Sequence, residues 1–419
     1  MKITGIIAEY NPFHNGHRYQ FEQIRPRSET DFLIVIMSGN FVQRGEPAVY
    51  DKYTRTLAAL KAGADLVLEL PAAFATSSAE DFAACGIALL DQLGVVNEVC
   101  FGSECGDIEE LSKIAAILAQ EPDDYRDLLR QELKSGISFP QARNRALVSW
   151  LNRHQPPKFF SEPANQLLTA PNNILGIEYI KAIRTRNSSL KPVTITRCGQ
   201  GYHDTAVDQG FASASGIRAV VKKSAGQEFP DTLAGQIPED AYSCYQHAVP
   251  IFAEDLSLLL NQTLLRLDRE QIPLTRYADV SEEMAARLQR HLLDFASFPV
   301  RIEQLKTRQY TYTRISRALL HLVLGITRTE MAHYRRMDYA PYARILGFRR
   351  QSTVLLREIK KNSTIPLISK TADAKNILSE SAFAMFSQDL YCSHLYQILQ
   401  QQKSGENPRN EYTRPVIIV

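Results

Sequence analysis

The stretch that decides the fold lies near the start of the chain and reads Gly5-Ile6-Ile7-Ala8-Glu9-Tyr10-Asn11-Pro12-Phe13-His14-Asn15-Gly16-His17. Its first part belongs to an apolar run, Ile3 to Ala8, which predicts a buried strand. From Asn15 to Ile24, apolar side chains recur at helical spacing, so a helix is expected to begin within the H-x-G-H string. The start of a helix carries unpaired N–H groups and the positive end of the helix dipole. The stretch therefore predicts a strand, a short loop and a helix start that can bind an anion.

The same alternation of strands and helices continues outward from this stretch. Further strands are expected at 32–37, 66–70, 95–101 and 193–197, and helices at 52–62, from Ser77 or Ser78 to Leu93, and at 172–183 and 215–223. Between 106 and 153 the pattern is helical throughout. Continuous apolar strands separated by helices predict a parallel sheet that is covered on both faces. Such sheets bind ligands at the carboxyl ends of their strands.

The second half of the chain has a different pattern. After about Ser224 the strand signals fade, and helices are expected at 256–267, 281–295, 315–324 and 377–387. The predicted fold class is therefore α/β: a Rossmann-like domain with a parallel sheet over residues 1–235, followed by a mainly α-helical region over 236–419.

The H-x-G-H string carries the strongest chemical signal. Gly16 has no Cβ, so the backbone can approach a phosphate closely. His14 and His17 can both donate hydrogen bonds to phosphate oxygens whose charge grows in a transition state. The alternative is two surface histidines beside a helix cap. The position of the string directly after a first strand favours the phosphate-binding interpretation.

Three further loops follow predicted strands or precede a predicted helix. The segment from Ser38 to Pro47 is polar and rich in turn-forming residues, and Lys52 and Arg55 follow it on one helical face, where they could supply cations. Gly102 ends the fourth predicted strand, and Ser213, Ser215 and Arg218 lie where another helix begins, as a second phosphate clamp would. The alternatives are a solvated helix start, a simple turn and an ordinary N-cap.

These residues resemble a known superfamily. H-x-G-H after strand one, with a helix start such as Ser213 to Arg218, is similar to the nucleotidyltransferases related to class I aminoacyl-tRNA synthetases. More narrowly, residues 5–17, Met37–Gly45, Ala64–Pro71, Phe101–Glu104 and Pro171–Gly176 resemble the bacterial tRNA(Met) cytidine acetate ligase family. In the superfamily's I-S-S-T-x-I-R motif, Ala212 and Ala214 replace Ile and Ser here, whereas Ser213, Ser215 and Arg218 are kept.

The resemblance implies a reaction and a set of site residues. Members of that family activate acetate with ATP to acetyl-adenylate and then acetylate N4 of the wobble cytidine of elongator tRNA(Met). The implied catalytic residues are His14, His17 and Lys52. The implied ATP-binding residues are Ile7, Ala8, Glu9, Tyr10, Asn11, Pro12, Phe13, His14, Asn15, Gly16, His17, Arg18, Tyr19, Gln20, Gly102, Asn172, Arg197, Ser215 and Arg218. Mg²⁺ is expected to accompany the ATP, and no metal site built from protein ligands is expected.

Charge is strongly polarised along the chain, although the net charge is only +2. Between Arg301 and Lys361 there are 14 Lys or Arg against 4 Asp or Glu, and the remaining residues hold 34 against 42. Tyrosines are interleaved with this basic segment, and cations with aromatic rings are typical of surfaces that bind unpaired RNA bases. The alternative is a solvated basic surface. The RNA-binding candidates are Arg314, Arg317, Arg335, Arg336, Arg349 and Arg350.

Composition excludes several other classes. The six cysteines are scattered without a C-x-x-C pair, which argues against a zinc ribbon and for reduced thiols in a cytoplasmic protein. No apolar run is long enough for a membrane span. Two other functions stay open on the residues alone. One is an adenylyltransferase for a small phosphorylated metabolite, and the other is an RNA-binding protein with a vestigial nucleotide fold. The basic segment argues against the first, and the intact H-x-G-H string argues against the second.

Overall fold

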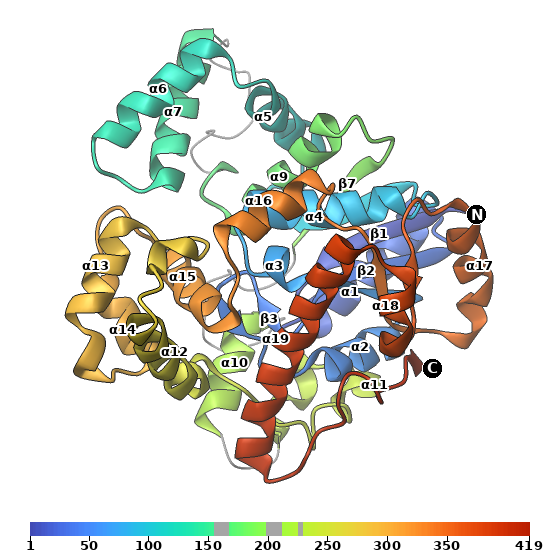
Figure 1. The fold of residues 1–419 in the computed structure, drawn as a ribbon. Coiled ribbons are helices and arrows are strands. Elements are labelled where there is room, and N and C mark those ends of the chain that lie inside the picture. Colours follow the sequence, from blue (N-terminus) through green and yellow to red (C-terminus); the bar gives the residue numbers. More distant parts are fainter. Residues whose placement is uncertain (155–166, 198–211, 225–228) are drawn as a thin grey trace.

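The computed structural model describes residues 1–154, 167–197, 212–224 and 229–419 (Figure 1). The strands are β1 Ile3–Ala8, β2 Phe32–Ser38, β3 Phe41–Val42, β4 Glu46–Pro47, β5 Leu66–Leu70, β6 Glu98–Ser103, β7 Lys191–Thr196, β8 Ala343–Phe348, β9 Leu367–Ile368 and β10 Ile417–Ile418. The helices of the first half are α1 Asn15–Ser28, α2 Lys52–Lys61, α3 Ala72–Ala75, α4 Ala79–Gln92, α5 Ile108–Gln120, α6 Asp123–Lys134, α7 Phe139–His154, α9 Pro171–Thr185 and α10 Ala214–Lys223. Those of the second half are α11 Glu239–Tyr242, α12 Ser257–Arg269, α13 Glu282–Arg290, α14 Phe298–Leu305, α15 Tyr312–Leu324, α16 Arg328–Arg336, α17 Thr353–Asn362, α18 Ala374–Ile377 and α19 Glu380–Ser404.

A mostly parallel sheet forms the centre of the molecule, in the order β10-β8-β5-β2-β1-β6-β7, with β9 paired to β8. β1 pairs with β2 along its whole length, so that Ile3 lies opposite Phe32 and Ala8 opposite Met37. The carboxyl ends of β1, β2, β5, β6 and β7 therefore meet at one edge. The predicted α/β class with a parallel sheet is confirmed.

Both faces of the sheet are apolar, as the continuous runs predict. Along β2, Leu33, Val35 and Met37 pack into one core cluster, with apolar side chains of α1, α2 and α10. The alternate residues Ile34 and Ile36 pack into the other, larger cluster, which includes side chains of α4, α9 and the helices of the second half. The larger core is thus continuous from the sheet into the region rich in helices.

The second half returns to the sheet. β8 pairs antiparallel with β5, and β10 pairs with β8, so residues from two distant parts of the chain complete one sheet edge. The expectation that strands cease after Ser224 is wrong in this respect. The apolar part of β8 is only the short run from Ile345 to Phe348, between two arginines of the basic segment, and its pattern does not stand out from a helix segment. The domain boundary at residue 235 stays a prediction.

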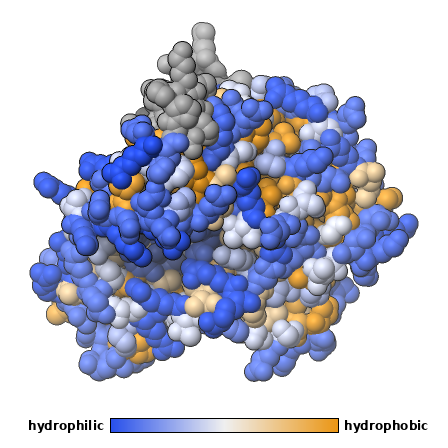
Figure 2. All heavy atoms as spheres, turned by 90° about the horizontal axis from the view of Figure 1, so that it is seen from above, coloured by the Kyte–Doolittle hydropathy of each residue, from blue (hydrophilic) through white to orange (hydrophobic). Residues whose placement is uncertain are grey.

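Most of the predicted elements form within a few residues of their expected places. Ser78 caps α4 by accepting a hydrogen bond from the Asp81 N–H, as expected. The helix α1 continues beyond Ile24 to Ser28, although Pro26 lies inside it. Within the described residues, every helix is too short or too polar to span a membrane. The face seen in Figure 2 is mainly hydrophilic, with apolar residues in small groups.

Candidate active site

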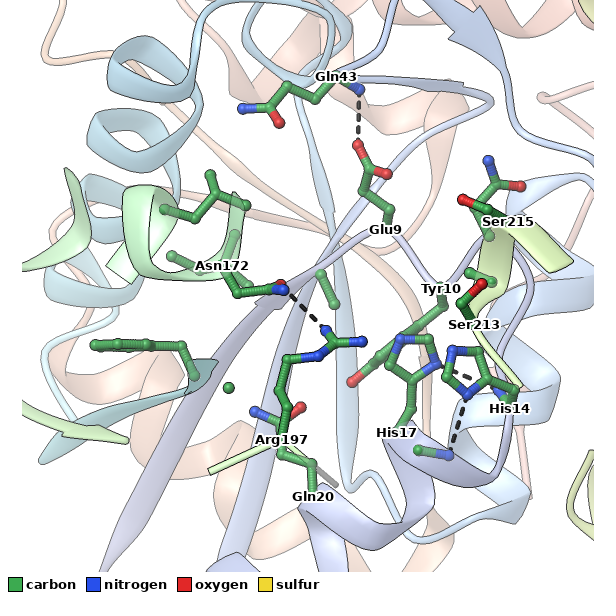
Figure 3. Close-up of a pocket in the computed structure, with 18 of the residues that line it drawn as sticks. Glu9, Tyr10, His14, His17, Gln20, Gln43, Asn172, Arg197, Ser213 and Ser215 are labelled. Carbon is green, nitrogen blue, oxygen red and sulfur yellow. Dashed lines mark hydrogen bonds between the residues drawn. The ribbon is translucent and has the colours of Figure 1, made fainter. Parts of the chain in front are cut away.

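A cavity of about 210 Å³ opens at the carboxyl ends of β1, β6 and β7. The starts of α1 and α10 border it, and Figure 3 shows their side chains converging on it from several sides. Of the residues predicted to bind ATP, those that line this cavity are Ile7, Ala8, Glu9, Tyr10, Asn11, His14, Gly16, His17, Tyr19, Gln20, Gly102, Asn172, Arg197, Ser215 and Arg218. The structure therefore brings together segments that lie up to about 200 residues apart in the sequence.

The two histidines of H-x-G-H cap the start of α1. Nδ1 of His14 accepts a hydrogen bond from the Gly16 N–H at 3.0 Å, and Nδ1 of His17 accepts one from the His14 N–H at 3.2 Å. In a neutral imidazole one nitrogen accepts and the other donates. Because each Nδ1 is used as an acceptor, each ring carries its proton on Nε2. No described residue partners either Nε2, so both N–H groups are available to a ligand in the cavity.

Both imidazoles are held in the neutral form. Burial, together with the nearby Arg197 and Arg218 guanidiniums, lowers the pKa of His14 to about 3. Burial also holds the pKa of His17 well below its ordinary value, and His14 and Arg197 act in the same direction. At neutral pH the pair supplies two neutral donors and the surrounding arginines supply the positive charge. This combination suits a polyphosphate.

Gly16 is required by the histidine beside it. A Cβ at this position would lie 2.8 Å from Cε1 of His14, which is closer than side chains pack. The rest of the loop is anchored from later in the chain. The Phe13 N–H donates to the Tyr245 hydroxyl, and the Asn15 amide donates to the Gly235 carbonyl. These contacts fix the direction in which the two histidines point.

The start of α10 lies next to the start of α1 at the cavity (Figure 3). Ser213 is its N-cap and accepts from the Gly216 N–H, whereas Ser215 lies in the first turn. Arg218 donates to Ser215 Oγ at 3.1 Å and to the carbonyl of Asn11 at 2.8 Å, which joins α10 to the H-x-G-H loop. Ser213, Ser215 and Arg218 thus come together at the cavity, and their role as a phosphate clamp stays a prediction.

A chain of hydrogen bonds joins Asn172 and Arg197, two further residues predicted to bind ATP. The carboxylate of Glu104 accepts from the N–H groups of Asn172 and Asn173 at the start of α9 and from the Asn172 amide. Asn172 Oδ1 in turn accepts from Arg197 at 3.1 Å (Figure 3). Gly102 lies beneath, and a Cβ there would meet Arg197 Cγ at 3.2 Å. The Arg197 side chain therefore packs directly over Gly102.

Some predicted site residues lie elsewhere. Pro12, Phe13, Asn15 and Arg18 do not line the cavity, and Phe13 is part of the core beneath it. Lys52 is fully buried behind the site, where its ammonium contacts the carboxylates of Glu69 at 2.8 Å and Glu411 at 3.0 Å. The catalytic role expected for Lys52 stays a prediction, and Lys52 does not line the cavity.

Arg55 is also buried and has a structural position. Its guanidinium donates to the carbonyls of Glu9, Ser38 and Gly39, which lie at or just beyond the carboxyl ends of β1 and β2. The cation expected to face a nucleotide instead holds together the two strand ends from which the site loops leave.

Other cavity residues have no clear signal in the sequence. Phe82, Leu175 and Tyr179 lie on helices, where apolar and aromatic residues are read as core. Gln43 and Arg44 belong to the turn between β3 and β4, a segment that polarity does identify without distinguishing its members. The remaining cavity residues that the sequence did not single out are Phe101, Ile195, Thr196, Ala212 and Ala214.

The basic segment contacts two elements that contribute residues to the cavity wall, the β3–β4 hairpin and α4. The hairpin of β3 and β4 packs on α15, where Ser316 Oγ donates to the Gly45 carbonyl, and Arg314 of the same helix stacks over Tyr310. In addition, Arg335 of α16 pairs with Asp81, the neighbour of Phe82 in the cavity wall.

The charged groups of several arginines in the basic segment do not contact the elements of the cavity wall. Arg301 and Arg344 are buried, and Arg317 pairs with Asp279 at 3.2 Å. Arg349 and Arg350 follow β8, whose antiparallel direction carries them to the amino end of β5, where the Arg349 N–H donates to the Asp65 carbonyl. That edge of the sheet lies opposite the cavity.

The fold and the donor set at the start of α1 define a nucleotidyltransferase of the H-x-G-H class. A family model described as HIGH Nucleotidyl Transferase matches residues 1–411. The chain is 37% identical to the tRNA(Met) cytidine acetate ligase of Acetivibrio thermocellus, with all of both chains covered. It is 40% identical to the protein of the same name from Thermoanaerobacter sp., covering 96% of this chain and 97% of the relative.

Solved structures agree with these matches. The crystal structure of Thermotoga maritima TmcAL in its apo form has a TM-score of 0.91 and 31% identity, with 100% of both chains covered. The same protein bound with alpha-thio ATP has a TM-score of 0.90. The chain belongs to the HIGH nucleotidyltransferase family and, within it, to the family of tRNA(Met) cytidine acetate ligases, which confirms the resemblance seen in the sequence.

Proposed function

We propose that this chain is a ligase that uses ATP to form acetyl-adenylate from acetate and then acetylates N4 of the wobble cytidine of elongator tRNA(Met). The observation that carries the proposal is the convergence of two Nε2–H donors, Arg197 and Arg218 around one cavity, which suits a triphosphate. The relatives' names and the bound ATP analogue of the Thermotoga maritima protein support the choice of substrates.

In the first step, the acetate oxygen attacks the α-phosphate of ATP, and pyrophosphate leaves. Negative charge grows on the phosphate oxygens as this happens. His14 and His17 donate Nε2–H groups from fixed positions, and they need no reorganisation because their Nδ1 atoms are held by the backbone. The start of α1 adds the positive end of its dipole. The same groups would hold pyrophosphate until it departs.

In the second step, the N4 amine of cytidine attacks the acetyl carbonyl, and AMP leaves. This amine is a weak nucleophile because its lone pair is delocalised into the ring. An acyl-adenylate is activated enough to react with it, so no covalent acyl-enzyme is needed. Within the described residues, the cavity is lined by no cysteine, and its two serines lie at the start of α10.

Mg²⁺ would accompany the ATP phosphates in this proposal. Among the described residues, no three His, Cys, Asp or Glu side chains are grouped so as to hold a metal ion. A Mg²⁺ ion therefore fits as a companion of the nucleotide phosphates, where it would offset their charge. Neither step of the proposed reaction depends on a metal site made of protein ligands.

The RNA-binding surface is proposed at the mouth of the cavity. Arg314 with Tyr310, together with exposed Arg335 and Arg336, flanks the two sides from which the basic segment approaches the site. An anticodon loop offers phosphates to the cations and unstacked bases to the aromatic rings. The proposed place of action is the cytoplasm, where tRNA is found.

Incubation of the protein with ATP, acetate and tRNA(Met), without coenzyme A, tests the proposal. Mass spectrometry of the digested nucleosides should detect N4-acetylcytidine, and AMP should form in place of ADP. Acetate-dependent exchange of pyrophosphate into ATP isolates the first step. Exchange without modified tRNA would keep the activation and refute the acceptor, and product formation only with acetyl-coenzyme A would refute the mechanism.

A further inference from the structure

Glu9 has an unusual position in the cavity. It directly follows β1, and it is the only acidic residue among the described residues that line the cavity. Its Oε1 accepts a hydrogen bond from the Gln43 N–H at 2.7 Å (Figure 3). Within the described part of the chain, no group donates to its Oε2. The backbone is fixed as well, because the buried Arg55 donates to the Glu9 carbonyl.

A carboxylate is an unexpected neighbour for the anionic ligands proposed to bind in this cavity. The cavity is lined by Arg44, Arg197 and Arg218 and by two imidazole donors, and the proposed ligands there are a triphosphate and acetate. Like charges close together destabilise one another, so Glu9 would weaken the binding of either anion unless it faces a hydrogen-bond donor of another substrate. Only the exocyclic amines of adenine and cytosine and the ribose hydroxyls offer such donors in this reaction.

The position of Glu9 favours the cytosine. Gly102 of β6, Asn172 of α9 and Arg197, which follows β7, form one wall of the cavity, whereas Glu9 is held by Gln43 of the β3–β4 turn. That turn packs against α15 of the basic segment through Gly45. The carboxylate therefore lies on the side of the cavity that is connected to the proposed RNA surface.

The hydroxyl of Tyr179 is a hydrogen-bond donor near Glu9. Burial raises the pKa of Tyr179, and the negative charge of Glu9 raises it further, so the phenol stays protonated. The Tyr179 ring packs against Phe101 at 5.5 Å between centroids, and both residues line the cavity. The surroundings of Glu9 thus combine aromatic surface with polar groups, as a site for an unstacked base requires.

We infer that Glu9 binds the N4 amino group of the target cytidine and accepts its proton during acetyl transfer, an inference that rests on the proposed function. The N4 lone pair forms a bond to the acetyl carbon, and the bond from that carbon to the oxygen of AMP breaks. AMP leaves with the bonding electrons, and the N4 proton passes to the Glu9 carboxylate and then to water. Carboxylates accept from cytosine N4 in nucleic-acid recognition generally.

The same contact selects the base. Uridine carries O4 in place of N4, and two acceptors facing one another are repulsive. A uridine in this position would lack the nucleophile and would also be rejected by Glu9. The side chain that takes the proton therefore contributes to the choice of cytidine.

The substitution Glu9→Gln tests the inference, because the amide keeps the shape and the acceptor for Gln43 but cannot take a proton at neutral pH. Two rates are measured on the full chain: acetate-dependent pyrophosphate exchange, and acetyl transfer from preformed acetyl-adenylate to tRNA(Met). The ratio of transfer to exchange should fall about 100-fold, the usual effect of losing a general base. Glu109→Gln, which neutralises an exposed carboxylate in the first turn of α5 and outside the cavity wall, is the control and should leave the ratio near that of the wild type.

Hydroxylamine provides an independent measurement. It reacts with acetyl-adenylate without a general base, so Glu9→Gln should form acetohydroxamate as fast, relative to exchange, as the wild type does. An equal loss of exchange and transfer in Glu9→Gln would mean that Glu9 acts on ATP, and it would overturn the inference. Wild-type rates of both reactions would overturn it as well. A wild type that exchanges pyrophosphate but forms no acetylcytidine would refute the proposed function, and this inference with it.

Discussion

The imidazole rings of His14 and His17 lie with their centroids 4.0 Å apart, and each accepts a backbone N–H through Nδ1 at the start of α1. One side of each ring therefore completes a helix cap, and the other side presents a donor to the cavity. Fold stability and ligand binding depend on different atoms of the same side chain. The two contributions can be separated by choosing what replaces the histidine.

His14→Asn and His14→Ala should differ in stability and agree in activity. Asparagine is a strong N-cap residue and can accept the Gly16 N–H, whereas alanine cannot and should cost about 1 kcal/mol of unfolding free energy. Neither residue supplies the Nε2–H group, so both should lose acetate-dependent exchange. Urea unfolding and pyrophosphate exchange measure the two effects, and near-normal exchange in either variant would contradict the role of His14.

His17→Ala should lower exchange by roughly 100- to 1,000-fold, the usual loss when one donor to a transition-state oxyanion is removed. Binding of tRNA, measured by filter retention, should change little because the basic segment is untouched. Equal losses of exchange and tRNA affinity would mean that the substitution disturbs the fold.

The pH dependence of both activity and stability follows from the lowered pKa of His14, which is about 3 in the folded chain against an ordinary 6.5. The free protein's His14 should not titrate between about pH 5 and 8, so kcat/KM for exchange should show no step near 6.5 from this group. Between 6.5 and about 3 the unfolded chain binds a proton that the folded chain does not. Stability should therefore fall as the pH falls through this window, and His14→Asn should reduce that fall in urea unfolding at several pH values.

The sequence predicts the first half of the molecule well because both signals are local. Apolar runs such as Ile3 to Ala8 report buried strands, and H-x-G-H names the residues that meet at the start of α1. β8 cannot be found in this way, because its pairing with β5 depends on contacts between residues nearly 300 positions apart. The same limit applies to Lys52. Its partner Glu411 is joined to it only by the fold, so a lysine after a polar loop is interpreted from the sequence as a phosphate ligand.

The six candidate RNA-binding arginines lie in one basic segment of the sequence, but the fold places them at different edges of the sheet. Arg314→Gln with Arg336→Gln should weaken tRNA binding and reduce its salt dependence, by about 0.7 to 0.9 in slope for each phosphate that is no longer neutralised. Arg349→Gln with Arg350→Gln removes the same charge at the opposite edge of the sheet and should change binding much less. Affinity measured over a range of salt concentrations compares the pairs, and equal losses would show that RNA extends across both edges.

Lys52→Met should destabilise the protein by about 3 to 5 kcal/mol, because it leaves Glu69 and Glu411 buried with one cation fewer. Burial alone would raise the pKa of Glu411, but the positive charges of Lys52 and Arg344 outweigh burial and lower this pKa to about 2. The stability from this ion pair is therefore present above about pH 4.5 and lost as the pH falls toward 2. Lys61→Met, on the exposed end of the same helix, is the control for urea unfolding. A Lys52→Met protein that is stable but inactive would support the catalytic role predicted from the sequence.

The pairing of β8 with the edge of β5 also has a consequence for synthesis on the ribosome. Lys52 leaves the exit tunnel long before Ser393, which follows it by 341 positions and whose hydroxyl accepts a hydrogen bond from its ammonium. During that interval the growing chain has β5 as an open strand edge, and open edges pair with other chains. Translation that stops early therefore releases a product with a bare edge and a lysine that lacks its distant partners. The edge of β5 and the ammonium of Lys52 can both be buried only after translation has reached the last hundred residues. Completion of the polypeptide and protection from aggregation are therefore achieved together.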